Sequence, residues 1–186
     1  MCCPSASTGG GAGGRLGELL ARRHVVVGVD VSGEMLMAAR RRLGGRIALV
    51  QASALRLPFS DATFAAAVSG FVLRNLPDLP AAFAEVSRVL SRGAPAAFVD
   101  ITEPAPVAFR RPFDLYFRAA APALGSLVGK REAYRYLVAS VARLPSRAEV
   151  SALLRGAGFT GVRARTLAPG MVTLWTAKRA MNGSGG

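Results

Sequence analysis

Asp30 is the first residue whose position indicates chemistry. It closes an apolar, β-branched stretch, His24–Asp30 (HVVVGVD), which predicts a strand buried on both faces, as in parallel sheets. Ser32 then stands where a helix N-cap is expected, and a helix is predicted to follow as far as Leu43. An aspartate at the carboxyl end of a parallel strand can accept hydrogen bonds from both hydroxyls of a nucleoside ribose. The alternative is a surface-loop aspartate near a helix N-terminus, and this stretch alone leaves both open.

A glycine-rich segment precedes this strand. Residues 9–14 read GGGAGG and satisfy G-x-G-x-x-G, and a helix is predicted from Arg15 to Arg23. Glycines let a backbone approach a ligand closely, and a helix N-terminus attracts negative charge. Such a low-complexity run also suits a flexible leader. The order of glycine turn, helix, strand and Asp30 is that of half a nucleotide-binding βαβ unit.

The other half of that unit is weak. A Rossmann-like sheet has a strand directly before the glycine turn, in the middle of the sheet. The candidate segment, Met1–Ser7, is short, polar and interrupted by Pro4. Because proline cannot donate a hydrogen bond to a central ladder, we expect this first strand to be missing or degenerate.

Strands and helices alternate along the rest of the chain. This alternation predicts an α/β fold with a Rossmann-like, mostly parallel sheet that ends in an antiparallel hairpin. A helix on the face Phe83, Val86 and Leu90 is expected to end at Gly93 as a left-handed cap. Further strands are expected at 47–52, 64–71, 96–101, 160–167 and 171–178, a helix from Ser146 to Gly156, and covering helices within 104–145.

Charge and composition limit the kinds of partner that the chain is expected to bind. The net charge is +13 over 186 residues, and all basic residues except Lys130 and Lys178 are arginines. The arginines are scattered rather than interleaved with aromatic residues, which argues against nucleic acid and favours attraction to an anionic membrane surface. Cys2 and Cys3 are adjacent, so they form neither a disulfide framework nor a metal site. The sequence shows no spanning stretch and no secretory signal, and a reducing compartment is the default expectation.

The chain contains six short motifs, in this order: Asp30-Val31-Ser32-x-x-Met35-Leu36, Leu57-Pro58-Phe59 with Asp61-x-x-Phe64, Phe71-x-Leu73-Arg74-Asn75, Glu85-x-x-Arg88-Val89-Leu90, Tyr134-x-Tyr136-Leu137-x-x-Ser140 and Ala157-Gly158-Phe159. With them, the chain from about Arg15 to Lys178 resembles the S-adenosylmethionine-dependent C-methyltransferases of ubiquinone and menaquinone biosynthesis (UbiE/MenG type), including the plastid phylloquinone form. The first two motifs and Ala-Gly-Phe are generic to class I methyltransferases. Leu-Arg-Asn and Tyr-x-Tyr-Leu-x-x-Ser are narrower and carry the quinone assignment.

The resemblance implies a seven-stranded sheet, S-adenosylmethionine as the cofactor and a prenylated quinol as the substrate. It implies that Asp30 holds the ribose, that the glycine turn packs against the methionine part, and that the loop after the third strand holds the adenine. The cofactor residues it implies are Gly10, Gly11, Gly14, Asp30, Val31, Ser53, Ala54 and Phe71. The substrate residues it implies are Tyr134, Tyr136 and Ser140, although two tyrosines separated by two positions on a helix cannot both face one pocket.

Four residues are candidates for the methyl-transfer step. Arg74 could stabilise a phenolate as a fixed cation, or it could form a salt bridge with a neighbouring acid. Asp100 or Glu103 could be the general base, or either could cap or pair with an arginine. Asn75 could orient a substrate oxygen or close a turn. His24, the sole histidine, is interpreted as structural, and no metal site is predicted.

Three features depart from the family pattern. Thr8, Ala12 and Gly13 replace residues of the glycine motif, Ser53 replaces an adenine-contacting Asp, and helices before the first strand have no counterpart. These departures motivate two alternatives. One is a catalytically inactive binding or scaffold protein. The other is an N-terminally truncated chain, whose first strand and leading helices would lie upstream of Met1. A dinucleotide-dependent oxidoreductase, which would use the same glycines, is ranked last.

The resemblance also sets an expected division of the chain and a location. We divide the chain into a glycine-rich leader at 1–14, a methyltransferase domain at 15–178 and a flexible tail at 179–186. The expected location is the cytoplasm or an organellar matrix or stroma, peripheral to a membrane, with other quinone-biosynthesis proteins as partners.

Overall fold

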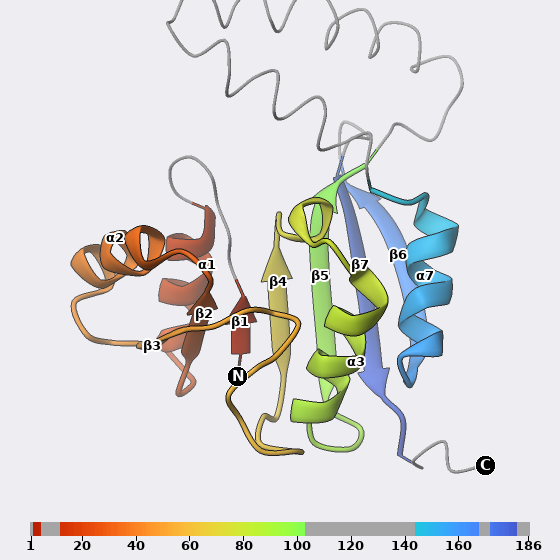
Figure 1. The fold of residues 1–186 in the computed structure, drawn as a ribbon, viewed down its shortest axis with the longest axis horizontal. Helices are drawn as coiled ribbons and strands as arrows, with labels where there is room; N and C mark the ends of the chain where they lie inside the picture. Colours follow the sequence, from red (N-terminus) through yellow and green to blue (C-terminus); the bar gives the residue numbers. More distant parts are fainter. Residues whose placement is uncertain (1, 5–11, 103–143, 168–171, 182–186) are drawn as a thin grey trace, which may run out of the picture.

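Seven strands form a single mixed sheet. The computed structural model describes residues 2–4, 12–102, 144–167 and 172–181 (Figure 1). The strand order is β3-β2-β1-β4-β5-β7-β6, and β7 runs antiparallel to both of its neighbours. The other pairings, from β3 across to β5, are parallel. The predicted α/β sheet with an antiparallel C-terminal hairpin is confirmed. The strands are β1 Cys2–Pro4, β2 Val27–Asp30, β3 Ala48–Gln51, β4 Ala67–Gly70, β5 Pro95–Ile101, β6 Phe159–Leu167 and β7 Val172–Arg179.

Helices pack on the sheet in two groups, each with its own apolar cluster. The helices are α1 Ala12–Ala21, α2 Gly33–Leu43, the 3-10 turn η1 Leu73–Asn75, α3 Leu79–Val89 and α7 Arg147–Gly156. Figure 1 shows α3 and α7 beside each other over the β5-β7-β6 part of the sheet. Beneath them Phe98 makes edge-on ring contacts with Phe83 (centroids 5.2 Å apart) and Phe159 (6.1 Å). A smaller cluster, Val26, Leu43 and Ile47, lies between the first two helices and their strands.

The first strand is present at the centre of the sheet in a shortened form. Cys2 to Pro4 pair in parallel with residues 27–29 of β2, whereas β4 is paired only through Cys2 and Ala67. Proline is tolerated here because Pro4 is paired with β2 alone. The pairing with β4 involves Cys2 and ends before Pro4, so Pro4 does not need to hydrogen-bond to strands on both sides. The strand is therefore short, as the prediction of a degenerate strand implies, but it does occupy the central position of the sheet between β2 and β4.

Several element boundaries differ from the sequence-based expectation. Helix α1 begins at Ala12, three residues before the predicted start, so glycines of the expected turn build its first turn. Strand β4 begins at Ala67 because Phe64 forms an isolated bridge with Leu90 instead of extending the ladder. Strand β7 continues to Arg179, which the sequence assigns to a tail.

Gly93 is not the cap of helix α3. The helix ends at Val89, and Gly93 lies in the turn before β5 with φ +73°. Its N–H donates to the Arg179 carbonyl (3.0 Å), and this contact fixes the turn against the last strand. The prediction of a left-handed conformation at Gly93 is confirmed, but the prediction that this glycine caps the helix is wrong.

Helix caps follow the sequence closely at the other places. The Ser32 side chain accepts from the Met35 N–H (3.3 Å), and Gly44 at φ +57° closes α2 as a left-handed cap. Ser146 and Glu149 form a reciprocal capping box at the start of α7. These caps fix where α2 and α7 begin, and α2 begins directly behind Asp30.

Candidate active site

The carboxyl ends of β2, β3, β4 and β5 meet at one edge of the sheet. After β3 the chain crosses back over β1 to β4, so the order of connections reverses between β1 and β4. Ligands of open α/β sheets bind in the crevice at such a reversal. The predicted site residues fall into two groups on its two sides, one around Asp30 and one around Asp100.

Asp30 is buried, with one oxygen engaged and one left without a partner. The side chain of this last residue of β2 is 5% exposed, and Oδ1 accepts from the Ser32 N–H at 2.9 Å. Oδ2 has no hydrogen-bond donor within the described residues. Burial raises the pKa of the Asp30 carboxyl, and the backbone N–H of Ser32 partly offsets this effect. A buried, unpartnered acceptor at the carboxyl edge fits the ribose hydroxyl that the sequence predicts for it.

The loop after β3 starts directly beside Asp30. The Ala52 N–H donates to the Asp30 carbonyl (3.1 Å), and Gln51 Nε2 donates to the Val31 carbonyl (3.0 Å). Ser53 opens a tight turn in which its hydroxyl accepts from the Leu55 N–H (3.2 Å). The structure thus brings the predicted adenine residues, Ser53 and Ala54, next to the predicted ribose residue. Val31 adds an apolar surface at this edge, since it is 66% exposed.

Arg74 and Asp100 form a buried ion pair at the second group. Arg74 NH1 donates to Asp100 Oδ1, and the side chains are 8% and 0% exposed. Asp100 also accepts from the Arg74 N–H (3.2 Å) and the Ile101 N–H (2.7 Å), so both carboxylate oxygens are engaged. Of the alternatives that the sequence leaves open, the structure shows the salt bridge. The roles of Asp100 as a base and of Arg74 toward a phenolate remain predictions.

The Nε–H of the Arg74 guanidinium is buried and has no acceptor within the described residues. The guanidinium carbon lies 6.0 Å from the Phe71 ring centroid. This N–H therefore remains available to an acceptor oxygen that the described residues do not supply.

Phe71 lies in a strained backbone conformation directly after β4. Its φ is +60°, which is unusual for a residue with a bulky side chain, and its N–H donates to the Val99 carbonyl at 2.7 Å. Such strain costs on the order of 1–3 kcal/mol and is concentrated at functional sites. It turns the chain out of β4 into η1, where the Asn75 N–H donates to the Val72 carbonyl. The strain supports the prediction that this turn lines a site.

The remaining predicted site residues lie in neither of these two groups. Gly14 lies in the first turns of α1 and not in a preceding turn, because that helix starts at Ala12. Gly10, Gly11, Glu103, Tyr134, Tyr136 and Ser140 lie outside the described residues.

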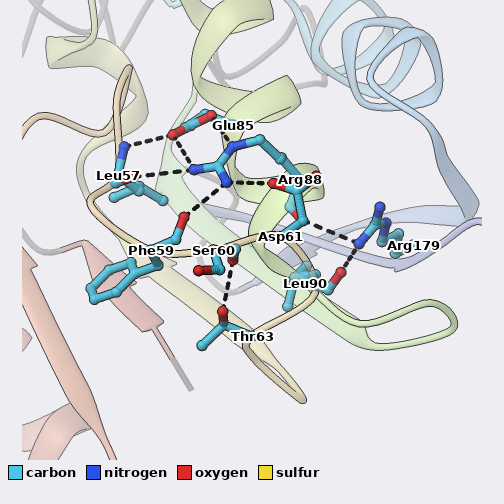
Figure 2. Close-up of polar contacts among 9 residues, drawn as sticks. All are labelled: Leu57, Phe59, Ser60, Asp61, Thr63, Glu85, Arg88, Leu90 and Arg179. Atoms are coloured by element: carbon cyan, nitrogen blue, oxygen red, sulfur yellow. Dashed lines mark hydrogen bonds and ion pairs between the residues drawn. The ribbon is translucent and has the colours of Figure 1, made fainter.

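A polar cluster that the sequence analysis gave no role lies behind the adenine-side loop. Figure 2 shows the Arg88 guanidinium among Glu85 of the same helix, the backbone carbonyls of Leu57 and Phe59, and the Asp61 carboxylate. A glutamate and an arginine three positions apart on a helix are a detectable signal, but such pairs are common on helix surfaces. Sequence spacing does not reveal that this pair also binds a loop about thirty residues earlier.

Two kinds of site have no support in the described residues. No group of three or more histidine, cysteine, aspartate or glutamate side chains gathers there in a way that would hold a metal ion. In the same part of the chain, each helix is too short or too polar to cross a membrane.

Comparison with known proteins decides the family. A sequence model of the ubiE/COQ5 methyltransferase family matches residues 5–179. The chain belongs to this family. The prediction of an S-adenosylmethionine-dependent class I methyltransferase is confirmed, and the inactive alternative is not favoured.

Individual relatives support the same assignment. The chain is 38% identical over 164 residues to the "Ubiquinone/menaquinone biosynthesis C-methyltransferase UbiE" of Syntrophotalea carbinolica, covering 87% of this chain and 69% of the relative. It is 32% identical over 185 residues to a "Demethylmenaquinone methyltransferase" of Desulfitobacterium hafniense, covering 96% and 72%. Among solved structures, a phosphoethanolamine N-methyltransferase of Haemonchus contortus in complex with S-adenosyl-L-methionine has a TM-score of 0.64 at 13% identity, covering 96% of this chain and 48% of that chain. This last likeness shows the shared fold.

Proposed function

We propose that this ubiE/COQ5-family chain transfers the methyl group of S-adenosylmethionine to a ring carbon of a prenylated quinol in quinone biosynthesis. The names of the relatives, ubiquinone/menaquinone C-methyltransferase and demethylmenaquinone methyltransferase, support this substrate class. The observation that carries the proposal is the buried Asp30 carboxylate with an unpartnered oxygen at the carboxyl edge of the sheet.

The residues around Asp30 would hold the cofactor. Asp30 would accept from the ribose, Ser53 and Ala54 would border the adenine, and the exposed Val31 would cover one side of the ring. Phe71 would face the methionine end from the turn after β4. When bound, S-adenosylmethionine supplies an electrophilic methyl group on a sulfonium.

Arg74 would act on the acceptor. A ring carbon becomes nucleophilic when the neighbouring hydroxyl loses its proton, and a fixed cation near that oxygen stabilises the anion. The unused Nε–H of Arg74 is suited to donate to it, while Asp100 holds the guanidinium in one orientation. Alignment of the two reactants and exclusion of water supply the rest of the acceleration.

We also propose that the protein works at an anionic membrane surface, from the cytoplasm or an organellar matrix or stroma. A prenylated quinol resides in the bilayer, and the net charge of +13 favours an anionic surface by about 1 kcal/mol for each basic residue near the lipid. Other quinone-biosynthesis proteins at the same surface are the expected partners.

Calorimetric titration with S-adenosylhomocysteine tests the cofactor site. Micromolar binding by the chain that is lost in Asp30→Ala is expected, and equal binding by both proteins would contradict the role of Asp30. Methyl transfer is then measured with radiolabelled S-adenosylmethionine and a short-chain demethylated quinol. A folded chain that binds no S-adenosylhomocysteine, or binds it and transfers no label, would refute the proposal. Cosedimentation with anionic but not zwitterionic vesicles checks the membrane surface.

A further inference from the structure

The connection from β3 to β4 is a loop held by α3. Residues 52–66 contain no helix, although this connection joins parallel strands. Loops of this length without a helix or strand are uncommon in a compact domain, and an ordered one is usually functional. Here the hold comes from α3, and Figure 2 shows the polar contacts that provide it.

Arg88 and Glu85 bind the backbone of the loop from one side. Glu85 Oε1 accepts from the Leu57 N–H at 2.6 Å. Arg88 donates to the carbonyls of Leu57 (NH2, 3.1 Å) and Phe59 (NH1, 2.8 Å). The two side chains are joined by two further hydrogen bonds of 2.8 Å each, from Nε and NH2 of Arg88. The planar guanidinium fork thus fixes two peptide groups of the loop at once.

The pair is charged and shielded at neutral pH. The Glu85 side chain is 15% exposed and the Arg88 side chain 32% exposed. The hydrogen bonds from Arg88 lower the pKa of Glu85, and Glu85 in turn raises the pKa of Arg88. Charge-assisted hydrogen bonds of this kind are stronger than neutral ones, so the contact limits loop motion more than an ordinary surface bond would.

The other end of the loop is fixed at Asp30. The Ala52 N–H donates to the Asp30 carbonyl, and beyond the turn Leu57 is 3% exposed. Phe59 packs edge-on against Phe64, with centroids 4.8 Å apart. Only the turn from Ser53 to Arg56 lies between the two anchors. The position of this turn is therefore determined by Asp30 on one side and by the Glu85–Arg88 pair on the other.

We propose that Arg88 and Glu85 are positioning residues for the cofactor: they hold Ser53 and Ala54 at the adenine without touching it. This inference rests on the proposed cofactor role of the loop. It assigns a role in binding to two side chains of α3 that contact the loop at Leu57 and Phe59.

The test compares Arg88→Met with Arg92→Met. Arg92 lies near the same end of α3, and its NH1 donates to the Met181 carbonyl at 3.0 Å, away from the loop. Calorimetry gives the dissociation constants of both variants and the wild type for S-adenosylhomocysteine and for S-inosylhomocysteine, which differs at the adenine amino group. Circular dichroism verifies that each protein is folded.

We expect Arg88→Met to bind S-adenosylhomocysteine about tenfold more weakly, the effect of losing roughly one well-formed hydrogen bond. Its preference for the adenine over the hypoxanthine compound should also fall, because the loop that distinguishes them is no longer held. General destabilisation would not change that preference in the folded fraction. Arg92→Met should match the wild type in both measurements.

Glu85→Gln keeps the inference testable if Arg88→Met does not fold. Glutamine retains an oxygen for the Leu57 N–H but loses the charge, so we expect a smaller change in the same direction. Unchanged affinity and preference in a folded Arg88→Met or Glu85→Gln protein would overturn the proposal, as would a wild type that binds both compounds equally. A wild type that binds neither compound would instead contradict the proposed function.

Discussion

Removing Arg74 should destabilise the fold, because Asp100 would be left charged in a dry environment. The Asp100 side chain is 0% exposed and the Arg74 side chain 8%. Arg74→Met removes the cation and keeps the apolar stem of the side chain in place. Two backbone donors remain on the carboxylate, the N–H groups of residues 74 and 101.

The magnitude follows from the burial of this pair. Breaking a buried ion pair by removing one partner costs roughly 3–5 kcal/mol, since the remaining charge is uncompensated. The two remaining backbone donors place Arg74→Met near the lower limit, at about 3 kcal/mol. Typical domains are stable by about 5–15 kcal/mol, so the loss is a large fraction of the total. The double variant Arg74→Met/Asp100→Asn removes both charges, and we expect it to regain about 2 kcal/mol of that loss.

Urea denaturation followed by tryptophan fluorescence measures these differences. Trp175 is the only tryptophan and is 0% exposed, so its emission reports unfolding of the main core. A cost below about 1 kcal/mol for Arg74→Met, or a double variant no more stable than the single one, would refute the reasoning. Either result would mean that the two backbone N–H donors, or water, compensate the Asp100 carboxylate without Arg74.

Three further changes are predicted. Asp30→Asn should raise the free energy of unfolding at neutral pH. Burial raises the Asp30 pKa in the folded state, so the charge of this carboxylate costs stability at pH values above that pKa. The same variant should weaken S-adenosylhomocysteine binding, because it removes the carboxylate proposed to hold the ribose. Urea curves and calorimetry on one preparation measure both effects, and a less stable variant would contradict the first. Glu85→Gln should lower stability at neutral pH. Because Arg88 lowers the Glu85 pKa, the difference from wild type should persist above the unfolded value of about 4.3 and vanish as the pH falls through the folded pKa. A difference independent of pH in urea titrations would contradict it. Ser146→Ala should cost about 1 kcal/mol through loss of the cap on α7, seen as a lower urea midpoint, and no shift would mean that the capping box adds nothing.

The parts of the site that depend on local signals were predictable. Asp30 was placed by the apolar run before it and by the Ser32 cap after it, and both signals lie within twelve residues. The hairpin of β6 and β7 was predicted to within one residue at each described strand end, because long β-rich stretches carry a strong pattern.

The parts that depend on contacts across the sheet were not predictable. Arg74 and Asp100 are 26 positions apart, and their pairing follows from β4 and β5 being neighbours. Sequence reasoning could offer a salt bridge only as one of two alternatives. The Arg88 contacts with the loop have the same origin, since they join segments about thirty residues apart.

Tertiary context also overrode local propensity at the beginning of the chain. Pro4 argues against a central strand, and glycines argue against a helix start at Ala12, yet both elements form. The strand is satisfied by its pairing with β2 along its whole length. Propensity alone could not show that the β4 side would need only Cys2.

Strand β6, at the edge of the sheet, has features that oppose edge-to-edge association between copies of the chain. A sheet edge with free backbone groups is a template for aggregation, and proteins protect such edges with charged side chains and bulges. Strand β6 has both: Arg163 and Arg165 are exposed on it, and its register with β7 shifts between Thr160 and Arg163. Part of the arginine excess therefore has a place in protecting this sheet edge. Replacing these two arginines with threonine would leave the fold intact and make it prone to edge-to-edge association.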